Sequence, residues 1–234
     1  MRINHKTALA VLGLSAALLG GNALAATTTL TGTYVSYTFN AADLGLFGTA
    51  SLSGDELVFA PTNFTATSTN GIPGAAFQTL HITVSASSGY LLSAINLAES
   101  GSYSLAGGAS VFVTGNITAL DIEGTANNQA IGNIAATAPL TVSGTPTNWI
   151  ANAGVVLPAT GWGGTDGIVN SIGLKITNQL FATSLSGGAA QIRKNAVGVN
   201  VVTSPVPEAN TYAMMLAGLG LVGFMARRRI NASA

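Results

Sequence analysis

The sequence predicts an all-β protein, an antiparallel two-sheet sandwich of the type that includes the jelly roll, flanked by two terminal helices. Between residues 26 and 206, apolar and polar side chains mostly alternate, which is the period of a half-buried strand. Clusters of Gly, Asn, Ser and Pro separate these segments at intervals of about ten residues, a spacing typical of two-sheet folds. No segment of this region carries the longer period of an amphipathic helix.

The first 25 residues have the organisation of a secretory signal peptide. Basic residues open the segment, and the apolar run 8–19 follows; at about 12 residues it is short for a membrane span. Ala23 and Ala25 place small side chains at the positions that a signal peptidase reads. We therefore expect a signal helix that is removed after Ala25.

The strands of the central region are predicted from their two-residue period. In 77–86, Leu80, Ile82 and Val84 share one face, and Thr79, His81 and Thr83 share the other. The segment 31–39 has the same pattern. Further predicted strands are 56–60, 89–97, 109–114, 116–122, 140–143, 172–177 and 197–202.

The composition excludes several classes of function. Charged residues make up 7% of the chain, against roughly 25% in a typical soluble protein. Residues 26–206 contain three basic residues against seven acidic ones, which gives −4, so nucleic acid is not an expected partner. The chain has no cysteine, which excludes disulfides, thiolate catalysis and Cys-ligated zinc.

Candidate catalytic residues are few. His81 is the single histidine outside the signal segment, and its place on the polar face of a strand favours a solvated side chain. Asp121 and Glu123, two residues apart on a strand, would share one face, with their Cα atoms about 6.6 Å apart. That spacing fits a solvent-facing acidic edge best, and it also permits a calcium site or a glycosidase pair. We expect no enzyme activity, no cofactor and no metal.

Two tryptophans are candidates for contact with a ligand. Trp162 lies in a glycine-rich loop, where an exposed ring could stack on a sugar, and Trp149 also lies beside loop-forming residues. Packing in the core is the commoner fate of tryptophan, and it is the favoured interpretation for both. Trp162 is kept as a speculative ligand contact.

The C-terminal segment predicts a short membrane helix. Residues 212–226 carry no charge, and Arg227, Arg228 and Arg229 follow directly. This stretch would reach about 22 Å, against roughly 30 Å of hydrocarbon, so flanking side chains must make up the difference. Three arginines are costly within lipid and should stay on the cytoplasmic side. Residues 203–206 would be an extended linker that holds the domain off the membrane.

This tail resembles the PEP-CTERM sorting signal, in which a Pro-Glu-Pro motif precedes a short hydrophobic helix and a basic cluster. Val206, Pro207 and Glu208 fit that motif, whereas the third position is Ala209 instead of proline. The resemblance implies recognition by an exosortase, a membrane transpeptidase that cuts near the motif. It also implies a Gram-negative bacterium that makes extracellular polysaccharide.

The predicted regions are a signal peptide (1–25), a β-rich extracytoplasmic domain (26–202), a linker (203–206), the sorting signal with its transmembrane helix (207–229) and a cytoplasmic tail (230–234). The predicted function is structural: an exported protein, first anchored in the inner membrane with its domain in the periplasm, then placed at the cell surface or in the extracellular matrix. Its expected partners are the exosortase, the membrane and extracellular polysaccharide, in a biofilm or floc. The alternatives are a carbohydrate-binding module that uses Trp162 and a glycoside hydrolase that uses Asp121 and Glu123.

Overall fold

A computed structural model describes residues 27–124, 127–206 and 209–232, with side chains at 27–124, 127–206 and 214–225. The predicted signal helix, with Ala23 and Ala25, and the motif residues Pro207 and Glu208 lie outside these ranges. Within them, the chain forms twelve strands, a short 3₁₀ helix and one α-helix. The elements are β1 (Thr27–Thr31), β2 (Val35–Asn40), η1 (Ala41–Phe47), β3 (Thr49–Ser53), β4 (Glu56–Ala60), β5 (Thr65–Thr69), β6 (Gly74–Ala86), β7 (Tyr90–Ala106), β8 (Ser110–Asp121), β9 (Gln129–Ala136), β10 (Thr147–Val156), β11 (Ser171–Thr183), β12 (Ala189–Pro205) and α1 (Ala209–Ala232).

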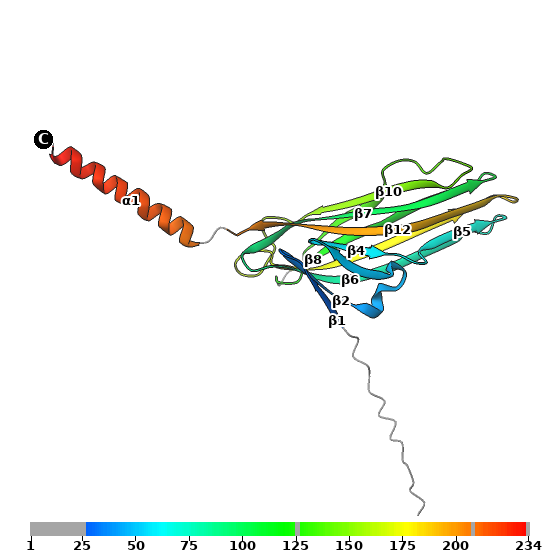
Figure 1. Cartoon of the computed structure of the whole chain (residues 1–234), viewed down its shortest axis with the longest axis horizontal. Coiled ribbons are helices and arrows are strands. Elements are labelled where there is room, and N and C mark those ends of the chain that lie inside the picture. Colours follow the sequence, from blue (N-terminus) through cyan, green and yellow to red (C-terminus); the bar gives the residue numbers. More distant parts are fainter. Residues whose placement is uncertain (1–26, 125–126, 207–208, 233–234) are drawn as a thin grey trace, which may run out of the picture.

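The strands form one continuous antiparallel sheet in the order β1-β2-β6-β11-β8-β9-β10-β7-β12-β4-β3, and β5 pairs with β12. The all-β, antiparallel prediction is therefore confirmed. The two-sheet sandwich, with its jelly-roll variant, is not confirmed, because β9 pairs with both β8 and β10 and joins the two halves of the sheet. Figure 1 shows the long strands β7, β10 and β12 side by side, and α1 standing apart from them.

The core lies between the two halves of the sheet, where β11 packs against β12 and β5. The inward positions of β11 alternate strictly, and Ile172, Leu174, Ile176 and Leu180 are all buried. An aromatic group closes one part of the core: the ring of Phe47 lies 5.3 Å from that of Phe59 and 5.8 Å from that of Phe64, measured between centroids. Alternation of apolar side chains therefore builds the core, as the sequence predicts.

Several predicted strands differ from the observed ones. The predicted strands 109–114 and 116–122 are one strand, β8, which continues through Gly115. Residues 140–143 form no strand, because the Val142 amide donates to the hydroxyl of Tyr103 instead of to a neighbouring strand. Residues 203–205, predicted as a linker, continue β12 and pair with β7.

The two ends of the sheet approach one another, and Asp55 joins them. Its carboxylate accepts hydrogen bonds from the amides of Thr33 (2.5 Å) and Tyr34 (3.1 Å), in the turn between β1 and β2. The buried hydroxyl of Tyr37 donates to the Asp55 carbonyl at 2.6 Å. Since Asp55 lies in the turn between β3 and β4, these bonds hold the first and last strands of the order together and leave the sheet nearly closed.

We expect Tyr37→Phe to lower the free energy of unfolding by about 1 kcal/mol at neutral pH, because the bond to Asp55 is lost. Burial, with the nearby charges of Asp55 and Glu56, raises the pKa of Tyr37 above its ordinary value of 10.0. The folded protein thus keeps the phenol proton longer than the unfolded chain, and the stability from this group is lost as the pH rises above about 10. Denaturant unfolding at neutral and alkaline pH should show a smaller alkaline loss in Tyr37→Phe than in the wild type. Tyr34→Phe, at an exposed ring, is the control, and equal alkaline losses in all three proteins would contradict the prediction.

Candidate functional site

The described part of the sorting segment is helical. Helix α1 includes the positions of Arg227, Arg228 and Arg229, and its described side chains, residues 214–225, are exposed to solvent. At the start of the motif, the Val206 amide donates to the Gly89 carbonyl at 2.8 Å, so the hydrogen-bonded structure of the domain extends to the first motif residues. Across the described residues, no helix combines the length and the apolar character needed to cross a membrane.

The carboxylates of Asp121 and Glu123 do not form the pair that the sequence predicts. Strand β8 ends at Asp121, which is buried, so the two residues do not share a strand face or form a solvent-facing edge. Asp121 Oδ1 accepts from the amides of Glu123 (3.1 Å) and Gly124 (3.0 Å), whereas Glu123 Oε2 accepts from the Asn170 amide (2.8 Å). Both carboxylates therefore fix backbone turns, beside a hollow of about 350 Å³ that Trp162 also lines.

Trp149, Trp162 and His81 lie where the sequence favoured them: the two tryptophans in the core and the histidine in solvent. Trp162 is 5% exposed and Trp149 3% exposed, and both belong to the core, so neither offers a free ring face for stacking on a sugar. His81 is exposed on the outer face of β6. No cluster of three or more His, Cys, Asp or Glu that could hold a metal ion occurs in the described ranges.

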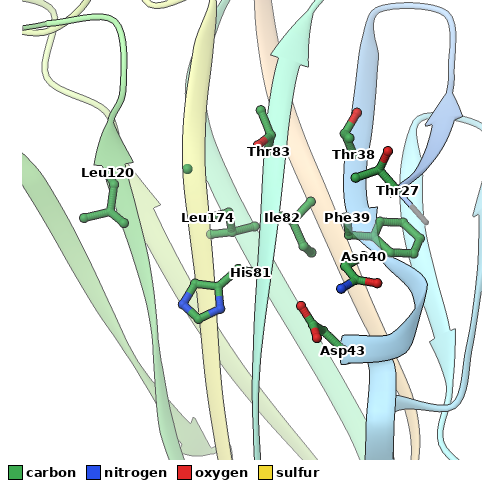
Figure 2. Close-up of a pocket in the computed structure, with 11 residues that line it drawn as sticks. Thr27, Thr38, Phe39, Asn40, Asp43, His81, Ile82, Thr83, Leu120 and Leu174 are labelled. Carbon is green, nitrogen blue, oxygen red and sulfur yellow. The ribbon is translucent and has the colours of Figure 1, made fainter. Parts of the chain in front are cut away.

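His81 borders a shallow hollow of about 300 Å³ on the outside of the sheet. Figure 2 shows His81 on one side of the hollow and Asn40 and Asp43 across from it, with Thr38 and Thr83 nearby. Gly173 also lines the hollow, where it has no side chain to fill the space. The arrangement offers hydroxyl, amide, carboxylate and imidazole groups to a polar ligand, beside apolar lining from Leu120, Leu174 and the largely buried ring of Phe39.

The most unusual chemistry of the domain lies in its interior. Glu99 on β7, Lys194 on β12 and Asn178 on β11 are buried together, with exposed fractions of 2%, 0% and 0%. Lys194 Nζ lies 2.5 Å from Glu99 Oε2, and Asn178 Nδ2 donates to Glu99 Oε1. One carboxylate therefore holds an amine on one oxygen and a carboxamide on the other. We call these three residues the buried triad.

Local structure fixes the members of the buried triad. Lys194 sits opposite Gly101, and a bulge at Asn195 shifts the register, so that Glu99 lies opposite Val197. Gly101 is required, since a Cβ there would lie 2.6 Å from the ring of Trp149 and 2.0 Å from the Arg193 carbonyl oxygen. The absence of a side chain at this position thus leaves room for the indole beside the triad.

Aromatic rings surround the amine of Lys194. Its Nζ lies 4.9 Å from the ring centroid of Phe64 and 5.9 Å from that of Trp149. The Trp149 indole is itself held by a 3.2 Å bond from Nε1 to the Arg193 carbonyl. Such rings stabilise a cation and also keep water away from it.

Burial shifts the ionisation of both charged members of the triad. It raises the pKa of Glu99 above its ordinary value of 4.5, an effect that the contacts with Lys194 and Asn178 only partly oppose. It lowers the pKa of Lys194 from 10.5 to about 8, against the opposing attraction of Glu99. Both shifts weaken the preference for the ion pair and make the neutral amine and the neutral carboxylic acid more accessible than they are in water. Asn178 Oδ1 is buried and has no hydrogen-bond partner among the described residues.

The sequence prediction missed the buried triad, although a signal for it exists. Each member occupies an inward position in an apolar alternation: Glu99 follows Ile95 and Leu97, and Asn178 follows Leu174 and Ile176. Lys194 follows Ala190 and Ile192 in the same way. Polar residues at inward positions of three strands predict a buried polar cluster, because each requires a partner.

We expect Lys194→Met to lower the free energy of unfolding by about 3–5 kcal/mol, because Glu99 is left in the core without its cation. The double variant Lys194→Met/Glu99→Met should lose less than the single variant, since it leaves no unpaired acid. Lys175→Met, at a partly exposed position on β11, is the matched control. Denaturant unfolding measures all three, and a Lys194→Met protein as stable as Lys175→Met would contradict coupling within the triad.

Comparison with protein families matches residues 205–229 to the PEP-CTERM protein-sorting motif. The match covers the predicted motif residues Val206, Pro207 and Glu208 together with the three arginines. It begins at Pro205, the last residue of β12, and therefore leaves the rest of the β-domain unmatched. No curated protein matches the chain. The chain therefore carries a PEP-CTERM sorting motif, as its C-terminal residues indicated.

Proposed function

We propose that the protein is an exported substrate of an exosortase, with a structural role in the polysaccharide layer at the cell surface. The observation that carries the export step is the sorting motif at residues 205–229, which indicates an exosortase-targeted protein with a membrane-anchored precursor in a Gram-negative bacterium. The structural role rests on the character of the domain that precedes the motif.

Its surface is suited to neutral hydrogen bonding instead of charge attraction. Hydroxyl side chains on neighbouring strands bond to each other, as in Thr29–Thr38 (2.8 Å), Ser85–Ser171 (2.9 Å) and Ser110–Thr183 (2.7 Å). Such cross-strand pairs stabilise the sheet and keep a row of hydroxyl groups at its surface. Polysaccharide, which is itself rich in hydroxyl groups, is a suitable partner for such a surface.

In this proposal α1 anchors the precursor in the inner membrane until the exosortase cuts. The uncharged stretch 212–226 is short, so the bilayer would thin around it and Arg227, Arg228 and Arg229 would remain at the cytoplasmic face. A weak anchor suits a segment that is held briefly and then removed.

Carbohydrate binding at a defined site is the second candidate function, and the hollow beside His81 is the observation that favours it. It gathers Thr38, Asn40, Asp43 and Thr83 around about 300 Å³ of space, whereas the ring of Trp162 is buried. Binding of the host's own polysaccharide that is lost in His81→Ala and kept in Trp162→Phe would support this site. The hydrolase alternative is less favoured: Asp121 and Glu123 line a hollow of about 350 Å³, but one oxygen of each carboxylate is bonded to backbone amides.

Sorting is tested by the fate of the tail. We expect a variant with Pro207→Ala and Glu208→Ala to keep its C-terminal helix and to stay in the membrane fraction. The wild type should lose the helix and reach the surface or the medium. Fractionation with intact-mass measurement, in cells with and without the exosortase, distinguishes these outcomes, and Thr203→Ala is a control just upstream. Identical mass and location of the wild type in both strains would refute sorting.

The structural role is tested separately, in cells that sort the protein normally. Deletion of its gene should reduce the cohesion of the biofilm or floc while the amount of polysaccharide stays the same. Measurement of aggregate strength under shear, with the gene restored as the control, checks this. Unchanged cohesion in the deletion strain would remove the structural role and leave the sorting result intact.

A further inference from the structure

We propose that the buried triad forms an intramolecular amide bond between Lys194 Nζ and Asn178 Cγ, with Glu99 as the group that moves the protons. This reaction lies beyond the proposed function and does not depend on where the protein is sorted. It requires an amine, a carboxamide and a proton carrier in contact, and the triad places all three together.

The geometry suits the reaction because one carboxyl group touches both reacting partners. Lys194 Nζ donates to Glu99 Oε2 and Asn178 Nδ2 donates to Glu99 Oε1, so nucleophile and leaving group are held on the two oxygens of one carboxylate. Fixing reactants in this way removes much of the entropy cost of bringing them together, which is the largest obstacle to attack on an unactivated amide.

The environment supplies the required protonation states. A lysine attacks only as the neutral amine, and burial among Phe64 and Trp149 lowers the pKa of Lys194 to about 8. A proton donor is also needed, and burial raises the pKa of Glu99. Transfer of one proton from Lys194 to Glu99 converts the ion pair into this reactive neutral pair.

The step balances without any co-reactant. The Lys194 amine attacks Asn178 Cγ while protonated Glu99 donates to the carboxamide, whose Oδ1 has no other hydrogen-bond partner among the described residues. Nζ returns a proton to Glu99, the proton that the carboxamide received passes to Nδ2 as the carbonyl re-forms, the Cγ–Nδ2 bond breaks, and Nδ2 leaves as ammonia. The Nζ–Cγ amide replaces the Cγ–Nδ2 amide, no electrons are transferred, and Glu99 is regenerated as a catalytic residue.

The bond would join the two halves of the sheet. Asn178 lies on β11, within the half that contains β6 and β8, and Lys194 lies on β12, within the half that contains β7 and β4. A covalent link there has the effect that a disulfide has in other exported proteins. The chain has no cysteine, so a disulfide is not available to it.

Mass spectrometry of the full chain tests the proposal. The wild type, unfolded in denaturant, should weigh one ammonia less than its sequence and mapped termini require. Digestion should leave the chain uncut after Lys194, and a single branched peptide should contain both Asn178 and Lys194. Beyond the signal segment the chain has two lysines, Lys175 and Lys194, which makes that peptide simple to identify.

Three variants separate the roles within the triad. Lys194→Arg and Glu99→Gln should keep the full mass, whereas Lys175→Arg, the matched control, should still lose ammonia. Asn178→Asp should lose water instead and give the same cross-linked product as the wild type. An identical cross-linked product from the wild type and from Asn178→Asp is expected if the bond forms, and not if the triad has only a structural role.

The mass and peptide map of the wild-type protein test the amide bond even if a variant fails to fold. Separate, unmodified peptides with Asn178 and Lys194 from the folded wild-type protein would overturn the proposal and leave the triad as a buried ion pair. Loss of ammonia mapped to the exposed Asn70-Gly71 turn, where a cyclic imide can form, would overturn it equally.

Discussion

The rest of the domain depends on how a buried carboxylate and a buried ammonium are accommodated in an apolar core. Removing either charge from water costs several kcal/mol, and an isolated one is not tolerated at neutral pH. Glu99 and Lys194 therefore require each other, and their meeting fixes the register of β7 against β12. A slip by one residue would move the amine to the outer face and leave the acid alone. The bulge at Asn195 and the missing side chain at Gly101 follow from this requirement, since they position the amine and leave room for the indole of Trp149.

The same requirement separates the chemistry of the interior from that of the surface. The described surface carries cross-strand hydroxyl pairs such as Thr29–Thr38 and Ser110–Thr183, and these groups suit weak, distributed contact. The candidate carboxylates Asp121 and Glu123 each accept from backbone amides through one oxygen and so maintain turns, while Asp121 Oδ2 has no hydrogen-bond partner among the described residues. The concentrated polar chemistry is then the buried triad, where water is excluded and a reaction between side chains competes with little else. In a domain of this type, the buried polar residues oppose unfolding and the uncharged polar surface is available for contacts.

Sequence reasoning succeeded where local alternation decides the structure and missed what depends on partners distant in the chain. Strands such as β6 were predicted because Leu80, Ile82 and Val84 repeat with the pleat of a sheet. The strand predicted at 140–143 was wrong because its Val142 amide is bonded by the hydroxyl of Tyr103, which local pattern does not reveal. Strands β9 and β10 place apolar or small residues on both faces, as Ile150 and Ala151 do, and were not predicted, so the link that makes one sheet out of two was missed. For the site, the sorting motif is local and was predicted in full. The buried triad, in contrast, joins Glu99 to Asn178 and Lys194, which lie 79 and 95 positions further along the chain.

The sorting tail and the domain place opposite demands on the chain, and the fold reconciles them. The tail must remain accessible to a membrane enzyme, yet the strand just before it, β12, is paired with β7 up to Pro205 and carries Lys194. A pull on the tail is therefore transmitted directly into the strand that holds the amine. When a strand is separated from its neighbour from one end, its hydrogen bonds break one at a time. A strong side-chain contact in the middle of the strand, such as that of Lys194, resists further separation at its own position. Lys194, eleven residues before Pro205, is placed where such a stop protects the remainder of β12 and its pairing with β5. The position of the buried triad thus limits how far β12 can be separated from β7 by a pull on its C-terminal end.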